Sequence, residues 1–291
     1  MFNNRWQKIQ PYLFLLPALI VLGIIVFFPA LQAFSLSFSR YEYDLTQAPE
    51  WIGWANFERL WQDEVFRRTI VNTFIYLVGV VPPLVILPLF LAILVNKKLK
   101  GINWFRTAYY TPVVISMVVA GIAWKAIYWS NGILNQFWLS LGFEQGIPWL
   151  TSPDLAIWSV MIVTIWKGLG YYMVIYLAGL QSISPELYQA AAIDGSVGIK
   201  KHFDITIPLM KPYILLVAVI SALSATKVFE EIYLLTQGGP QNSTKTVVYY
   251  LYEKAFQDLD INYASTIGLV LFTFILILSI VNFVLSREVE G

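Results

Sequence analysis

The sequence lacks the residues that several kinds of reactive site need. It contains no cysteine, which excludes disulfides, thiolate metal sites and cysteine nucleophiles. Its single histidine, His202, excludes any site that needs two imidazoles. Charged residues make up only 13% of the chain, about half the share in an ordinary soluble domain, and the formal net charge is +1. There is therefore no domain-wide basic excess of the kind that nucleic-acid binders carry.

Sequence motifs of catalysis are missing as well. No HExxH, GxSxG or DDxxD occurs, which disfavours a membrane enzyme. No P-loop of the form GxxxxGKS or GxxxxGKT occurs, so we expect this chain neither to hydrolyse ATP nor to bind a cofactor or metal of its own.

Long apolar runs are what the sequence has in abundance. Hydrophobic residues make up 58% of the chain, which is typical of an integral membrane protein. A spanning helix needs about 20 mainly apolar residues, and six stretches qualify: roughly 12–38, 69–95, 107–128, 155–179, 208–231 and 264–286. The first run is longer than the roughly 7–15 apolar residues of a signal peptide, so we expect a retained span.

The lysines and arginines are distributed unevenly among the segments between the runs. With the N-terminus inside, the inner segments hold nine of them and the longer outer segments hold six. Basic residues favour the cytoplasmic side, so both termini are predicted to be cytoplasmic. The segment around residues 180–207 then faces the cytoplasm.

This inner segment contains the signals of a short helix. Ser184 is a good N-cap, Pro185 suits the first helical position, and Ala190–Ala192 favour helix. Gly195 suits a left-handed residue after the helix end. The pattern predicts a helix over 185–193, and nine residues are too few for a helix that is stable alone in water. It must dock on its own protein or on a partner.

The same segment resembles the cytoplasmic EAA loop of binding-protein-dependent ABC importer permeases. The resemblance rests on Gln189-Ala190-Ala191, Asp194-Gly195 and a downstream Ile205-Thr206-Ile207-Pro208. Gln189 departs from the acid of that motif, and Ile207 from its leucine. Two further stretches look like carbohydrate-type permeases: TIWKGLGYYMVIYLAGLQSISPELY from Thr164 and IYLLTQGGPQNSTKTVVYYLYEKAF from Ile232. Nearly the whole chain is similar, in order and spacing, to the maltose-transporter permease class.

The resemblance implies an all-α membrane protein with six transmembrane helices and the type I ABC importer permease fold. It implies one permease domain over 1–291, with a five-helix core over about 69–286 and a first span that wraps a partner. The helix 185–193 would be the coupling helix that rests on a cytoplasmic ATPase. Its expected coupling residues are Glu186, Tyr188, Gln189, Ala190, Ala191, Asp194 and Gly195.

The partners that the resemblance implies are a second homologous permease, two cytoplasmic ABC ATPases that bind ATP and Mg²⁺, and an extracytoplasmic solute-binding protein. The loop Thr236–Pro240 is either near the docking face for that protein or a plain turn. The expected location is a bacterial inner membrane.

Ionisable residues in the apolar runs point to a substrate pathway, because an unpaired charge at mid-bilayer costs at least about 2.5–3.5 kcal/mol. Lys167 lies deep in the fourth run, either lining a cavity or making a structural hydrogen bond to the partner permease. Lys227 and Glu230 are three apart and either form an ion pair or bind substrate. The expected pathway residues, which suit a polyhydroxylated ligand, are Trp166, Lys167, Tyr171, Lys227, Phe229 and Glu230.

The resemblance thus implies a permease that imports a sugar or related polyol. An importer of glycerol phosphate esters or another non-sugar solute is the alternative. A secondary transporter usually shows paired repeats or coupling-ion carboxylates deep in its spans. It is disfavoured here because six spans are few for that work and the runs hold no deep aspartate or glutamate.

Overall fold

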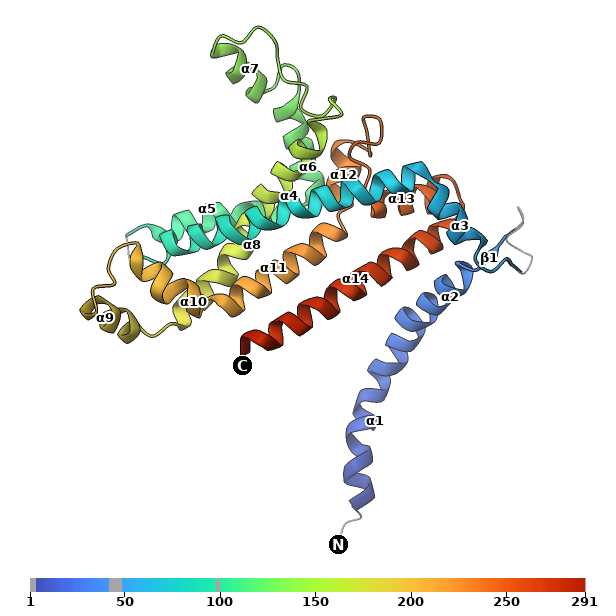
Figure 1. Cartoon of the computed structure of the whole chain (residues 1–291), viewed down its shortest axis with the longest axis horizontal. Coiled ribbons are helices and arrows are strands. Elements are labelled where there is room, and N and C mark those ends of the chain that lie inside the picture. Colours follow the sequence, from blue (N-terminus) through green and yellow to red (C-terminus); the bar gives the residue numbers. More distant parts are fainter. Residues whose placement is uncertain (1–3, 42–48, 98–99, 291) are drawn as a thin grey trace. The chain divides into compact units, whose positions relative to one another are not determined.

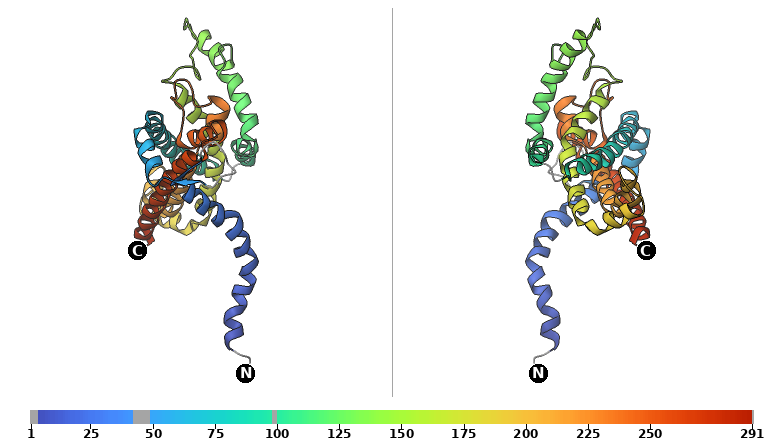
Figure 2. Two further views of the ribbon diagram at one scale, coloured as in Figure 1. Left: turned by 90° about the vertical axis from the view of Figure 1, so that its right-hand side faces the viewer. Right: turned by 90° about the vertical axis from the view of Figure 1, so that its left-hand side faces the viewer.

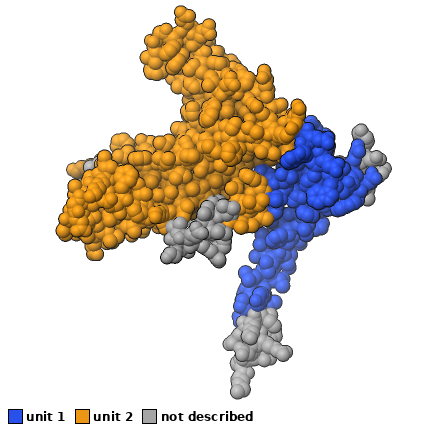
Figure 3. All heavy atoms as spheres, in the orientation of Figure 1, with its two compact units in different colours: residues 1–63, 251–273 blue, residues 64–250, 274–291 orange. Residues whose placement is uncertain are grey.

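The computed structural model describes residues 4–41, 49–97 and 100–290, and the chain forms two compact units. Unit 1 comprises residues 1–63 and 251–273, and unit 2 comprises residues 64–250 and 274–291 (Figure 3). Lys98, one of the basic residues of the expected inner segments, lies outside the described residues, as do residues 1–3 and 291. The single domain over 1–291 and the core over 69–286 stay predictions.

Unit 1 begins with a long apolar helical run. α1 (Asn4–Leu22) continues through the π-helical turn η1 (Gly23–Phe27) into α2 (Phe28–Leu36). Residues 10–36 form a candidate span with mean hydropathy 2.7, and none of the residues in its most apolar window is buried within the chain. A helix that is apolar all round must be covered by lipid or by another protein.

The rest of unit 1 is a small assembly of two short strands and helices. Strands β1 (Ser39–Arg40) and β2 (Glu50–Trp51) pair antiparallel, and α3 (Ala55–Gln62), η3 (Glu253–Gln257) and the first part of α14 (Ile261–Glu290) complete it. The hydroxyl of Thr266 donates to the Ser37 carbonyl at 3.2 Å. Arg59 pairs with Asp260 at 2.7 Å.

Unit 2 is a bundle of helices (Figure 1). Besides the end of α14, its helices are α4 (Glu64–Val95), α5 (Ile102–Val114), α6 (Met117–Tyr128), α7 (Ile133–Ser140), α8 (Ala156–Ser182), α9 (Pro185–Ile193), η2 (His202–Thr206), α10 (Ile207–Leu209), α11 (Lys211–Thr226), α12 (Glu230–Leu235) and most of α13 (Val247–Tyr252). α8 packs against α4 and α5, and α4 also packs against α11. The buried core of this bundle includes Tyr76, Val80, Val160, Met173 and Val217.

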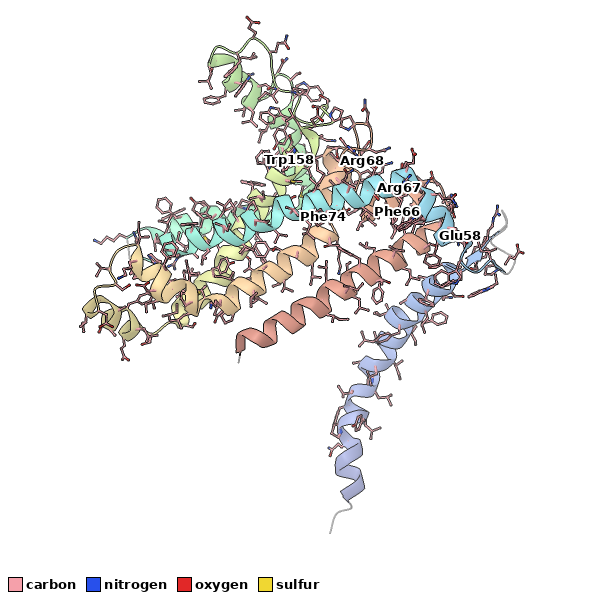
Figure 4. The ribbon with its side chains drawn as sticks, in the orientation of Figure 1. Glu58, Phe66, Arg67, Arg68, Phe74 and Trp158 are labelled. Atoms are coloured by element: carbon pink, nitrogen blue, oxygen red, sulfur yellow. The ribbon has the colours of Figure 1, made fainter. Side chains whose placement is uncertain are left out.

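Glycine lets two helices of the bundle approach closely. A Cβ atom at Gly170 of α8 would lie 2.2 Å from the carbonyl oxygen of Tyr109 in α5. Small residues at helix interfaces allow such backbone contacts in membrane proteins. Large apolar side chains remain outside the core, including Phe74 of α4, 62% exposed, and Trp158 of α8, 51% exposed (Figure 4).

The expected all-helical membrane fold is confirmed, but two of the six predicted spans are not single helices. Within the described residues, four helical stretches are long and apolar enough to span alone: 10–36, 64–95, 156–182 and 261–280. The predicted span 107–128 is instead bent by 100° between α5 and α6, because Ile115 is extended and Ser116 caps the next helix. The predicted span 208–231 is bent by 57° near Met210, between two prolines, and its helix ends at Thr226.

Candidate transport pathway and coupling site

A cavity of about 440 Å³ lies among the helices of unit 2. Its walls come from α4, α8, α11, α12 and the end of α5. The polar and aromatic side chains in its lining are Tyr76, Thr164, Lys167, Tyr172, Ser221, Ser224, Lys227, Phe229, Glu230 and Glu231. Hydroxyl, ammonium and carboxylate groups therefore face one space inside an apolar bundle, which is how membrane proteins build sites for polar solutes.

Lys167, at the edge of this cavity, also binds the backbone at the end of α5. Its ammonium donates to the carbonyl oxygens of Ile115 at 2.7 Å, Pro112 at 3.1 Å and Val113 at 3.5 Å. These carbonyls stand where α5 ends and the chain turns into α6, and the last carbonyls of a helix have no partner within it. A cation at a helix C-terminus is favourable. The structural hydrogen bond considered for Lys167 therefore exists, but to its own chain.

Three of the other expected pathway residues lie together at the cavity. Lys227, Phe229 and Glu230 all line it. Among the described residues no ion pair joins Lys227 to Glu230, so the first of the two alternatives considered for them, an ion pair, does not hold. The reason is the backbone: α11 ends at Thr226 and α12 begins at Glu230, so helical i,i+3 spacing does not apply between them.

The remaining two expected residues do not line the cavity. Trp166 packs edge-on against Trp124 with ring centroids 5.5 Å apart. Tyr171 is 43% exposed, and its ring lies edge-on to Tyr172, which does line the cavity. Their roles as pathway residues stay predictions.

Sequence reasoning missed all the hydroxyl groups in the lining, namely those of Tyr76, Thr164, Tyr172, Ser221 and Ser224. Thr164 and Tyr76 share a hydrogen bond between α8 and α4. Thr164, Lys167 and Gly168 follow the i, i+3, i+4 spacing of one helix face, and Ser221 and Ser224 are three apart on α11. This spacing of small polar residues within apolar runs was the available signal.

The predicted short helix over 185–193 is confirmed as α9. The Ser184 side chain accepts a hydrogen bond from the Glu186 amide at 3.3 Å. Gly195 has φ +82°, the Gly195 amide donates to the Ala192 carbonyl at 3.2 Å, and the Ser196 amide donates to the Ala191 carbonyl at 2.8 Å. This pair of bonds is the Schellman arrangement, so both ends of the helix are capped.

One face of α9 is fastened to the segment that leads into α11. The Tyr188 hydroxyl and His202 Nδ1 each lie 3.1 Å from the hydroxyl of the buried Thr206. The Ser196 hydroxyl donates to the Asp204 carboxylate at 2.7 Å. Figure 1 shows α9 at the end of the bundle where α8 ends and η2 and α10 follow.

The other face of α9 and the turn after it are uncovered. Glu186, Gln189, Ala190, Asp194 and Gly195 are exposed, whereas Tyr188 is half-buried and Ala191 is buried. Large apolar side chains are exposed here too, namely Leu187, Ile193, Val197, Ile199 and Phe203. The expected coupling residues therefore divide into an anchoring pair, Tyr188 and Ala191, and a set that is free to contact a partner.

Comparisons with known proteins agree with this geometry. A family model described as "Binding-protein-dependent transport system inner membrane component" matches residues 63–291. The chain is similar to the lactose transport system permease protein LacF of Rhizobium radiobacter, with 33% identity over 290 residues that cover 98% of this chain and 96% of LacF. It is 34% identical to the arabinooligosaccharides transport system permease protein AraP of Bacillus subtilis, covering 98% and 91% of the two chains.

A solved structure is similar over almost the whole chain. It is the crystal structure of a bacterial alginate ABC transporter in complex with an alginate pentasaccharide-bound periplasmic protein. The matching chain has a TM-score of 0.84 and 25% identity, with 99% of this chain and 98% of that chain covered. This chain belongs to the family of binding-protein-dependent transport system inner membrane components.

Proposed function

We propose that this chain is the permease subunit of an ATP-driven saccharide importer and forms the translocation pathway with a second, related permease. The observation that carries the proposal is α9, a capped nine-residue helix that is fastened to the bundle on one face and uncovered on the other. An isolated helix of that length is marginal in water, and the exposed Ile193, Ile199 and Phe203 beside it favour a protein partner.

The partner at α9 is a cytoplasmic ATPase subunit. Two such subunits bind ATP and Mg²⁺, since this sequence contains no P-loop. When they close on ATP, α9 moves with them as a rigid unit. The termini and α9 lie on the cytoplasmic side of a bacterial inner membrane, in keeping with the distribution of basic residues.

The second permease faces the cavity of unit 2. The cavity is open on one side, and without a partner its polar lining would face lipid there. A second subunit therefore completes the pathway. The exposed run of α1 and α2 gives that subunit a helix to contact. A periplasmic solute-binding protein delivers the substrate; this is supported by the alginate transporter structure, which is a complex with an alginate pentasaccharide-bound periplasmic protein.

The substrate is a saccharide. Relatives are named for lactose and arabinooligosaccharides, and the structural neighbour imports the acidic polysaccharide alginate. A sugar has apolar C–H groups and polar hydroxyls. The first suit the aromatic rings of Tyr172 and Phe229, and the second suit the hydroxyls of Ser221 and Ser224. Within the described residues the Lys227 ammonium makes no hydrogen bond or ion pair, and this favours an anionic solute such as a uronate or a phosphate ester as the second candidate.

Cysteine cross-linking tests the ATPase contact directly, since the chain has no native cysteine. Gln189→Cys should cross-link to a cysteine in the surface cleft of the ATPase within the assembled complex. Phe74→Cys, exposed on α4, is the matched control and should not. Failure of Gln189→Cys and of Ala190→Cys to cross-link in an active complex would refute the role of α9.

Reconstitution tests the saccharide substrate, the dependence on ATP and the need for partner subunits. Proteoliposomes with both permeases, the ATPases and the binding protein should take up a radiolabelled sugar from a panel of lactose, arabinotriose, maltotriose and a uronate trisaccharide only when ATP is inside. The purified chain alone should neither hydrolyse ATP nor take up sugar. Uptake by the chain alone in response to an ion gradient would contradict the assignment.

A further inference from the structure

A second, larger cavity lies beside α7, outside the pathway. It has a volume of about 890 Å³ and is formed within unit 2 by the end of α6, the loops on either side of α7 and the residues that follow α12. Its lining includes Lys125, Tyr128, Trp129, Asn131, Asn135, Glu144, Trp149, Thr151 and Thr236. In the orientation proposed above, these loops face the outside.

The walls of this cavity are held by a dedicated set of hydrogen bonds. The buried Asn135 amide donates to the carbonyls of Trp129 at 3.0 Å and Ile147 at 3.2 Å. Its oxygen accepts from the Ile147 amide at 2.8 Å and from the Trp149 indole at 3.2 Å. One side chain therefore joins both loops that flank α7, and the cavity is built before any ligand arrives.

The other wall is fixed in the same way. The Thr244 hydroxyl donates to the Gly239 carbonyl at 2.8 Å and lies 2.7 Å from the Thr236 hydroxyl. The Tyr128 hydroxyl donates to the Ser159 carbonyl at 2.9 Å. The donor groups of Thr244 and Tyr128 are therefore occupied by the fold.

Four lining side chains are left out of that network. The Trp129 indole is 67% exposed. Within the described part of the chain, no ring contact, hydrogen bond or ion pair involves the side chains of Trp129, Lys125, Asn131 or Glu144. An exposed aromatic face, an amide, a cation and a carboxylate therefore surround a preformed space.

We propose that this cavity is a saccharide subsite, which binds one to three sugar units before they enter the pathway. The inference rests on the proposed function, because it assumes that a sugar arrives from the outer side. A pyranose ring presents C–H groups to an aromatic face and hydroxyls to groups that both donate and accept hydrogen bonds, and the four free side chains supply both. The volume lies within the usual range of small-molecule sites.

The test is saturation-transfer NMR on the complete permease–ATPase complex in lipid nanodiscs, without binding protein or ATP. Lactose, arabinotriose, maltotriose and a uronate trisaccharide are the probes, used in turn. The wild-type complex should transfer saturation to the C–H protons of the sugar that it transports. Trp129→Ala should lower this transfer about twofold or more, since an aromatic contact worth about 0.5–1.5 kcal/mol corresponds to about 2- to 13-fold in affinity.

The matched control is Trp158→Ala, which removes a similarly exposed tryptophan from α8 at a position outside the cavity lining (Figure 4). Its transfer should equal that of the wild type. Glu144→Gln should weaken transfer with an unchanged melting temperature, because Glu144 has no bond to lose in the fold.

Three outcomes would overturn the subsite: no transfer in the wild type, unchanged transfer in Trp129→Ala, or an equal fall in both tryptophan variants. Uptake by wild-type proteoliposomes separates this failure from a wrong function. If ATP-driven sugar uptake is normal while the cavity variants have no effect, only the subsite is wrong.

Discussion

The contact at Gly170 allows the packing of α5 on α8 to be tested with one methyl group. In Gly170→Ala, the new Cβ would lie 2.2 Å from the Tyr109 carbonyl oxygen, 2.8 Å from Tyr110 Cα and 2.9 Å from the Tyr109 carbonyl carbon. All three are backbone atoms, so no rotamer change relieves the overlap and the helices must separate by about 1 Å. Overpacking of this kind costs about 3 kcal/mol, while alanine gains about 1 kcal/mol of helix propensity. We expect a net loss of about 2 kcal/mol.

The matched control is Gly168→Ala on the same helix. Its Cβ would meet Leu84 Cδ2 at 2.9 Å and Tyr172 Cε2 at 3.3 Å, which are ends of movable side chains. We expect its stability to stay within about 1 kcal/mol of the wild type. Thermal unfolding of the purified complex measures both, and Gly170→Ala should lower the melting temperature by about 4–8 °C. Equal melting temperatures for Gly170→Ala and wild type would refute the close backbone approach.

Three other variants test the site. Lys167→Met removes the donor to three carbonyls and should lower stability by about 2–3 kcal/mol in thermal unfolding, whereas unchanged stability with lost uptake would show a substrate role instead. Gly195→Val forces a branched residue into φ +82° and should raise the number of ATP molecules hydrolysed per sugar imported; wild-type uptake with the ATPases bound would contradict this. Thr206→Val removes the hydrogen bond from α9 through Tyr188, together with the local bond to His202, and should reduce uptake several-fold while the ATPases still bind; undiminished uptake would show that this fastening is unimportant.

Local chemistry made α9 predictable from the sequence. A serine, a proline and a glycine at fixed offsets around three alanines require no distant contact to define a helix, and the predicted bounds 185–193 match the structure. The apolar runs were equally predictable, since a membrane-spanning helix needs about 20 apolar residues whatever it packs against.

Long-range packing explains what the sequence could not show. The break at Ile115 is stabilised by Lys167, which is 52 residues away in the sequence. No residue near Ile115 indicates that such a hydrogen-bond donor will be present. Likewise, Tyr188 is an anchor because Thr206 lies beneath it. The ion pair considered as one alternative for Lys227 and Glu230 does not form because α11 ends at Thr226, so the two residues do not have helical i,i+3 spacing.

The position of α9 along the chain connects it to two of the helices that form the walls of the cavity. It follows α8 after two residues, and its fastening to Thr206 reaches the segment that runs through α10 into α11. α8 contributes Thr164 and Lys167 to the cavity, and α11 contributes Ser221 and Ser224. A displacement of α9 would therefore act on two walls of the cavity at once, through covalent connections on one side and buried hydrogen bonds on the other. Because Lys167 also holds the end of α5, movement of α8 would reach the bent third span without a further relay.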